Sequence, residues 1–178
     1  MSFLFRVFLF FSLFFLTYVS AKEEWTIKKF NNLSYAQVTG EVTYGDHLSF
    51  FLRSENNCEK VWNTFTVYTY EKPEDIYDLR LKKIPIKING QQLLSTVQDI
   101  SPFLMGYRFV FSLGQFNTDQ YINFLNEFYT EFNLFEIEIV DGENFKSSKY
   151  FDIKKNNWVL DDLNKSINQA KLLCRELL

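Results

Sequence analysis

His47 is the single histidine among the 178 residues, so a serine or cysteine nucleophile would have to use it as a base. Asp46 precedes His47 directly, but neighbouring residues of an extended strand point to opposite sides, which leaves Asp46 poorly placed to orient the imidazole. The sequence contains no Gly-x-Ser-x-Gly motif to present a serine at a sharp turn. We therefore interpret His47 as a histidine at a strand end and expect no catalytic residue.

Glu136 and Glu138 form the best pair of carboxylates for acid–base hydrolysis. They are separated by one residue, so they would share one face of a strand, as the two acids of a glycosidase require. Phe135, Ile137 and Ile139 alternate with them and are typical of a core-facing side, which would turn the glutamates toward water. A hydrolase that uses these acids is therefore the less favoured alternative.

Metal and phosphate sites have weak sequence support. Asp141-Gly142-Glu143-Asn144 contains the residue types of a calcium loop, but it lacks the twelve-residue spacing and the closing glutamate. One histidine and two cysteines give zinc no complete ligand set. The six glycines are scattered, with no glycine-rich loop before a helix. We expect the 141–144 segment to be a turn and expect no metal or other cofactor.

Aromatic side chains are the strongest candidates for recognition, since Phe, Trp and Tyr make up 19% of the residues. Trp62, Tyr68 and Tyr70 would share the less aliphatic face of one strand, and Phe103 and Met105 would lie in a loop. Aromatic rings offer a large apolar surface, with a polar atom in Trp and Tyr, that suits a ligand groove or a partner. Either these five residues form a recognition surface, or helices cover that face and bury them.

Cys58 and Cys174 are the only cysteines, so one intramolecular disulfide is possible. An oxidising compartment favours that bond, and two buried thiols or an intermolecular link are the alternatives. Because the chain has no Cys-x-x-Cys motif, the pair has no sign of redox catalysis.

The elements that would position these residues are mainly strands. Period-two alternation and hairpin turns, such as Asn89-Gly90, indicate antiparallel pairing. The expected strands cover residues 25–30, 35–43, 47–53, 61–70, 84–88, 91–97, the segment that begins at Tyr107, 134–140 and 145–153, with a loop at 101–106.

Two helices complete the expected fold. Asn117 or Thr118 can cap one helix that runs to about Phe132. The C-terminal segment has an apolar stripe at helical spacing that includes Cys174 and would bring it near Cys58. We therefore expect an α+β fold, mainly an antiparallel β-sandwich or curled sheet of about eight strands with one internal helix and a packed C-terminal helix, as a single domain over residues 22–178.

Residues 1–21 have the features of a secretory signal peptide. Arg6 is their only charge, an apolar run follows, and Val19 and Ala21 supply small residues for cleavage after Ala21. An uncleaved anchor is the alternative, although the apolar run is shorter than the roughly 20 residues of a comfortable span. No later run approaches spanning length, so we expect no membrane span after signal removal.

The charge balance limits the partners. With 19 Lys and Arg against 22 Asp and Glu, the chain lacks the basic excess that neutralises phosphates, so we expect no nucleic acid. We expect an exported protein, secreted or periplasmic, that acts as a non-catalytic binding or interaction module for a protein or an envelope component. The main alternative is a carrier of a small apolar ligand in a cavity behind the sheet, and the less favoured one is a cell-envelope hydrolase.

Overall fold

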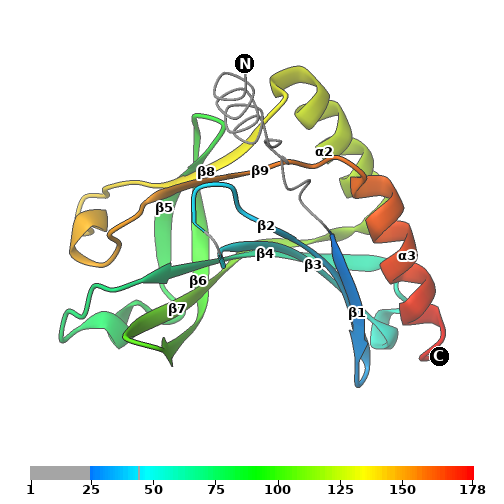
Figure 1. Cartoon of the computed structure of the whole chain (residues 1–178), viewed down its shortest axis with the longest axis horizontal. Helices are drawn as coiled ribbons and strands as arrows, with labels where there is room; N and C mark the ends of the chain where they lie inside the picture. Colours follow the sequence, from blue (N-terminus) through cyan, green and yellow to red (C-terminus); the bar gives the residue numbers. More distant parts are fainter. Residues whose placement is uncertain (1–24, 44) are drawn as a thin grey trace, which may run out of the picture.

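The computed structural model describes residues 25–43 and 45–178, so the predicted signal segment 1–21 lies outside the described residues. The protein has the expected α+β fold, with one antiparallel sheet and two α-helices (Figure 1). The strands are β1 (Thr26–Phe30), β2 (Leu33–Thr39), β3 (His47–Arg53), β4 (Lys60–Thr69), β5 (Lys83–Ile88), β6 (Gln91–Phe103), β7 (Gly106–Asn117), β8 (Phe135–Ile139) and β9 (Lys155–Trp158). The helices are α2 (Thr118–Phe132) and α3 (Leu163–Arg175), with short 3₁₀ helices η2 (Ser54–Asn56), η3 (Ile76–Leu79) and η4 (Ser147–Lys149).

The nine described strands form one curled sheet rather than the two sheets of a sandwich, in the order β1-β2-β3-β4-β7-β6-β5-β8-β9. The register shifts between β4 and β7 at Asn63 and Thr64, and between β6 and β7 at Val97 and Asp99. Such bulges bend a strand and increase its twist. The bending brings β9 toward the segment after β2, where the Glu41 amide donates to the Asn157 carbonyl at 3.0 Å.

Three segments differ from the expected pattern. Strand β2 ends at Thr39, so the last four residues of the predicted strand 35–43 belong to the β2–β3 connection. Strand β6 continues to Phe103 through the predicted loop 101–106, because its residues pair with β7 up to a tight turn. The predicted strand 145–153 is wrong, since this segment is a loop that contains η4. The Asp141 carboxylate accepts hydrogen bonds from the backbone and side chain of Ser147, which folds the segment back. The strand that pairs with β8 begins later, at Lys155.

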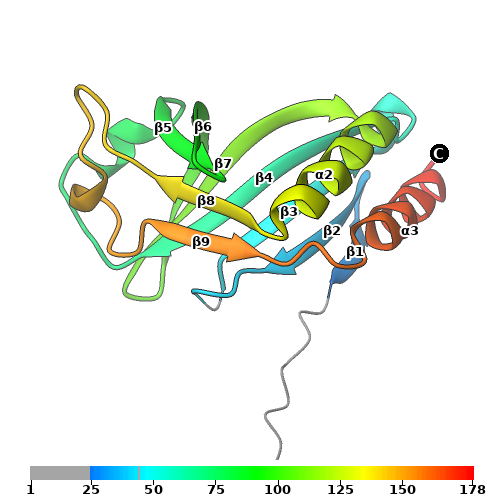
Figure 2. The same ribbon diagram turned by 90° about the horizontal axis from the view of Figure 1, so that it is seen from above.

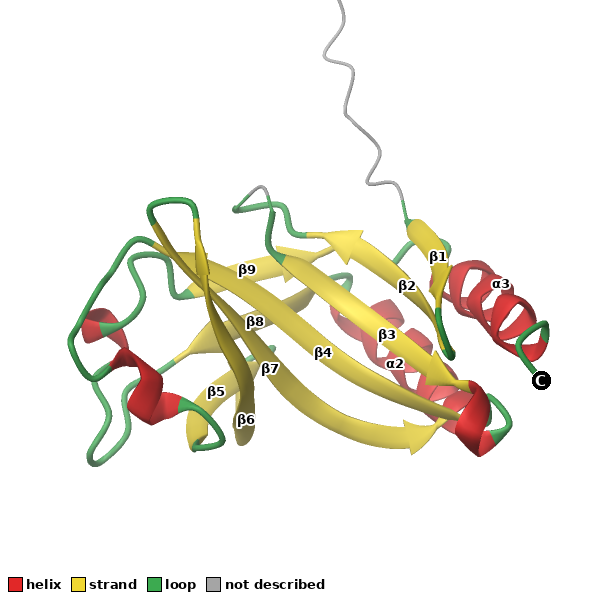
Figure 3. Ribbon diagram, turned by 90° about the horizontal axis from the view of Figure 1, so that it is seen from below, coloured by secondary structure: helices red, strands yellow, loops and turns green. Residues whose placement is uncertain are grey.

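The core lies between the inner face of the sheet and the two α-helices, and the opposite face, which we call the helix-free face, carries no α-helix among the described residues (Figures 2 and 3). Phe65 and Phe111 stack across β4 and β7 at 4.5 Å between ring centroids. Trp158 and Phe50 are also fully buried. Because side chains alternate along a strand, each residue of the helix-free face lies next to a core residue in sequence.

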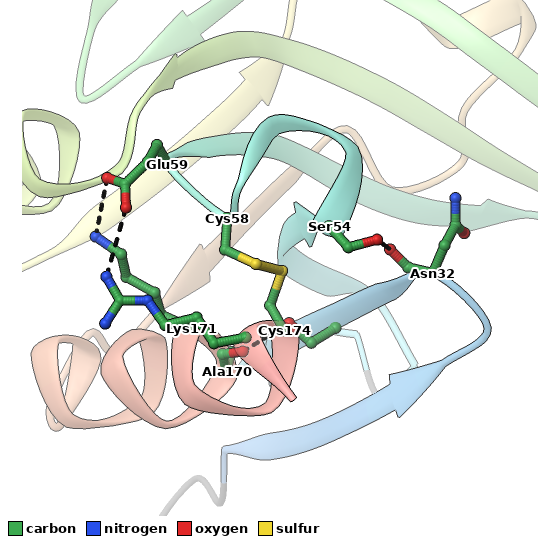
Figure 4. The surroundings of a disulfide bond; sticks show 9 residues. Asn32, Ser54, Cys58, Glu59, Ala170, Lys171 and Cys174 are labelled. Carbon is green, nitrogen blue, oxygen red and sulfur yellow. Dashed lines mark hydrogen bonds and ion pairs between the residues drawn. A yellow bond between two sulfur atoms is a disulfide. The ribbon is translucent and has the colours of Figure 1, made fainter. Parts of the chain in front are cut away.

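The predicted Cys58–Cys174 disulfide is confirmed and ties α3 to the start of β4 (Figure 4). The two Cα atoms are 6.0 Å apart, and the cysteines are 116 residues apart in sequence. The Ser34 hydroxyl also donates to the Ala170 carbonyl at 2.6 Å, which holds the same helix against β2. A disulfide of this kind is compatible with an extracellular location. None of the helices within residues 25–43 and 45–178 combines the length and the apolar character that a membrane crossing needs.

Candidate functional site

The candidate site is a pocket of about 410 Å³ at one end of the sheet, which we call the tyrosine pocket. The β2–β3 connection, the β6–β7 hairpin and the segment before β9 meet at this end (Figures 2 and 3). Its volume lies within the range of small-molecule sites. The pocket is lined by Thr43, Gly45, His47, Tyr68, Thr69, Tyr70, Phe103, Leu104, Tyr107, Asp152 and Ile153.

Strand pairing explains why aromatic residues distant in sequence meet here. Tyr68 lies on the helix-free face of β4, and Phe103 ends β6, two strands away in the sheet. Their ring centroids are 4.5 Å apart. Gly106 allows β7 to begin directly against β4, because a Cβ there would lie 2.0 Å from the Thr69 carbonyl oxygen. The small residue therefore brings the hairpin close enough for Phe103 to pack on Tyr68.

His47, Asp152 and the tyrosines are the titratable groups that line the pocket. Burial lowers the pKa of His47, which favours the neutral imidazole. Its Nδ1 atom is buried and has no hydrogen-bond partner within the described part of the chain. Burial also raises the pKa of Tyr68, and this effect outweighs the opposite effect of the nearby Arg108 charge.

Asp46 and Asn156 form a buried contact beneath the pocket, which we call the Asp46 seam. The Asp46 carboxylate accepts from Asn156 Nδ2 at 2.8 Å and from the Tyr68 amide at 3.1 Å. Burial raises the pKa of Asp46 to about 6, with these hydrogen bonds opposing the rise and the Asp152 charge adding to it. The Asn156 oxygen in turn accepts from the Val42 amide at 2.9 Å. The seam thus anchors the β2–β3 connection to β9.

Trp62 lies in a separate hollow on the helix-free face, the Trp62 groove. Its indole N–H donates to the Ser112 hydroxyl at 2.8 Å, and the Arg53 guanidinium stands over the ring at 5.8 Å from its centroid. The groove has a volume of about 510 Å³. Its lining residues are Arg53, Glu55, Asn56, Lys60, Trp62, Gln98, Ser112 and Gln115.

The structure therefore separates the five predicted recognition residues. Tyr68, Tyr70 and Phe103 share the tyrosine pocket, Trp62 lies in its own groove, and Met105 is 73% exposed at the hairpin turn. Sequence reasoning did not place any residue of the β2–β3 connection or the segment before β9 in a ligand site. Their spacing carries no local signal, because only the curl of the sheet brings those segments together.

The remaining candidates have structural partners. Glu136 forms an ion pair with Lys155 at 2.7 Å, and this contact raises the pKa of Lys155. Hydrogen bonds from Ser147 and Lys146 hold the pKa of Asp141 at about 2, which fits its role in the turn. Among the described residues, no group of three or more His, Cys, Asp and Glu side chains is placed to hold a metal ion.

The chain matches no protein-family model, no curated protein and no solved structure.

Proposed function

We propose that the protein is an exported, non-catalytic binding module that holds the apolar part of a small ligand in the tyrosine pocket. The observation that carries this proposal is the convergence of four aromatic side chains, Tyr68, Tyr70, Phe103 and Tyr107, on one hollow of about 410 Å³. A concave site lined mainly by apolar and aromatic side chains, with a few polar groups, is the usual form of a small-molecule site.

The polar groups of the pocket would orient the ligand. His47 Nε2 would donate to or accept from one polar atom of the ligand, because Nδ1 is buried. Asp152 lies at the exposed side of the pocket and would favour a ligand without negative charge nearby. A ligand with an apolar body and one hydrogen-bonding group fits this arrangement.

The hollow that borders the core offers little space by comparison. The hollow bordered by Phe65, Ile137 and Trp158 has a volume of only about 10 Å³. That is room for about one water molecule. A carrier function would therefore use the pocket at the end of the sheet rather than a cavity within the core.

The predicted signal segment and the Cys58–Cys174 disulfide support export. Native mass spectrometry of protein exported with its own N-terminal segment and purified without reductant would test both location and cargo. A heavier native species that loses a small molecule on denaturation would favour a carrier, and a bare protein would favour a module that binds its ligand reversibly.

Binding is tested with N-phenyl-1-naphthylamine, an uncharged aromatic probe whose fluorescence rises in apolar sites. We expect saturable binding that weakens about fivefold or more in Tyr70→Ala and Leu104→Asp. Phe30→Ala is the matched control, because Phe30 and Tyr70 are each 65% exposed and Phe30 lies on β1, outside the pocket. Absence of saturable binding, or equal affinity in all three variants, would contradict the proposal.

A further inference from the structure

We infer that the Trp62 groove is a second binding site, and that it takes an uncharged β-1,4-linked oligosaccharide. The site is independent of the tyrosine pocket, because it lies at the opposite end of the same face of β4. Trp62 and Tyr68 are six residues apart on that strand, which corresponds to about 20 Å. No residue lines both hollows.

Trp62 ends a row of three aromatic rings that runs from the groove across the neighbouring strands. Tyr35, Phe51 and Trp62 are direct partners in register on β2, β3 and β4. Their successive ring centroids are 5.6 and 5.9 Å apart. This aromatic row is partly exposed, whereas Ala36, Phe50 and Val61, adjacent in sequence, are fully buried on the other face. The row covers two strand spacings, about 10 Å, which is about the length of a disaccharide.

Polar side chains surround the row at the Trp62 end. Gln115 is the next residue in register after Trp62, and Gln98 and Asn56 also line the groove. Each amide offers both donors and acceptors. The Arg53 guanidinium stands over the Trp62 ring and is exposed, so a sugar seated on the row would displace it to the ring edge, where its N–H groups would meet the sugar hydroxyls. The hydrogen bond from Trp62 to Ser112 fixes the indole, so little ring freedom is lost on binding.

An aromatic row with amide side chains beside it matches a sugar better than other ligands. A β-1,4-linked hexose carries its hydroxyls around the ring edge and presents C–H groups on its faces, so an aromatic surface with amides beside it meets both parts. The charged lining residues are Arg53, Lys60 and Glu55, so the groove has a net charge of only +1, far from the basic excess that a polyanion needs. A purely apolar ligand would leave the amides and the guanidinium unpaired.

A peptide partner is a poor fit for the same face. Strands β2, β3, β4 and β7 are each paired on both sides, so no free strand edge is available for backbone pairing. Recognition on this face has to use side chains. The groove is also open rather than enclosed, which suits a chain of sugar rings that extends beyond it.

The test uses calorimetric titration of the oxidised protein with cellotetraose and, separately, with chitotetraose. We expect at least one of the two to bind with a Kd of about 0.1–1 mM. Trp62→Ala should weaken that binding about tenfold or more, and Gln115→Ala about threefold, because the first removes the stacking surface and the second only an amide. Tyr70→Ala, in the other pocket, should bind like the parent protein.

Gln115→Ala is a second test of the groove that leaves the aromatic row intact. It would still show whether the groove binds the sugar if Trp62→Ala failed to fold. No binding of either tetrasaccharide would overturn the proposal, as would full affinity in both Trp62→Ala and Gln115→Ala. Sugar binding that is lost in Tyr70→Ala and kept in Trp62→Ala would also overturn it, by placing the sugar in the tyrosine pocket. Naphthylamine binding reports on the tyrosine pocket, and tetrasaccharide binding reports on the Trp62 groove. A negative result in one titration therefore contradicts only the proposal for that site.

Discussion

Asp46 and His47 are neighbours in sequence whose ionisation affects stability in opposite directions. Burial raises the pKa of Asp46 to about 6 and lowers the pKa of His47. The folded state therefore holds a proton on Asp46 more tightly than the unfolded chain does, and on His47 less tightly. Each difference changes the free energy of unfolding over a defined pH range.

The first prediction concerns the pH dependence of the free energy of unfolding. The contribution of Asp46 is fully present below its ordinary pKa of 3.8 and is lost as the pH rises to about 6. A rise of this size corresponds to at most about 3 kcal/mol. The contribution of His47 is present above its ordinary pKa of 6.5 and is lost as the pH falls through its lower folded value. The two effects oppose each other below about pH 6, where the Asp46 contribution falls with rising pH while the His47 contribution grows, so the parent protein should show a shallower profile there than either variant.

Two variants separate these effects by urea unfolding at pH 4, 5, 6 and 7. In His47→Gln, stability should fall from pH 4 to pH 6, because only Asp46 titrates. In Asp46→Asn, stability should rise from pH 5 to pH 7, because only His47 titrates. The carboxyls of Asp75 and Asp141 have lowered pKa values, so they act mainly below this range. Identical profiles in the two variants would contradict the assignment.

The second prediction, at the scale of an element, concerns the attachment of α3. The disulfide closes a loop between residues 116 positions apart, which removes entropy from the unfolded chain. Replacing Cys58 and Cys174 together with Ala should lower the free energy of unfolding by about 2–5 kcal/mol. Urea unfolding measures the loss, and the parent protein in dithiothreitol should lose a similar amount. Equal urea midpoints for oxidised and reduced parent protein would disprove this role.

The third prediction concerns the start of β7. A Cβ at Gly106 would lie 2.0 Å from the Thr69 carbonyl oxygen, so Gly106→Ala must push the hairpin away from β4. We expect Gly106→Ala to weaken naphthylamine binding about tenfold, because Phe103 would move off Tyr68. Gly90→Ala is the control: nothing lies within 4 Å of its added Cβ, and its φ of +84° adds only local strain of about 1–2 kcal/mol. Equal binding by both variants would count against the role of Gly106.

Elements with a strong local pattern could be predicted from the sequence. The helix expected to run to about Phe132 is α2, and the strand predicted at 47–53 is β3. The predicted strand 145–153 fails because its alternation competes with a side-chain contact, from Ser147 to Asp141, that spacing does not reveal. The sequence identifies Tyr68, Tyr70 and Phe103 as recognition candidates, but it does not reveal that Phe103 of β6 packs on Tyr68 at the end of β4 away from Trp62. Thr43 and Ile153 line the tyrosine pocket because the curl of the whole sheet brings their segments together, which the sequence does not reveal.

At the scale of the molecule, the curl of the sheet determines where the tyrosine pocket forms. It brings the β2–β3 connection and the segment before β9 to the tyrosine pocket, while the helices cover only the inner face. The curl is held on that side by backbone contacts and by Asn156, which is 2% exposed. Its side chain bonds the Asp46 carboxylate, the Val42 amide and the Asn157 amide.

The fourth prediction follows from this network. Asn156→Ala would leave the buried Asp46 carboxylate with one fewer donor and two amides without their acceptor, and each buried group left unsatisfied costs about 1–3 kcal/mol. We expect a loss of about 3 kcal/mol in the free energy of unfolding and faster hydrogen exchange at Val42 and Asn157. Asn157→Ala is the matched control, because its side chain bonds Glu41 in an exposed contact. That variant should change stability by less than about 0.5 kcal/mol.

Because the seam positions the β2–β3 connection, Asn156→Ala should also weaken naphthylamine binding while leaving tetrasaccharide binding unchanged. Loss of both together would show that the seam supports the whole sheet rather than one end of it.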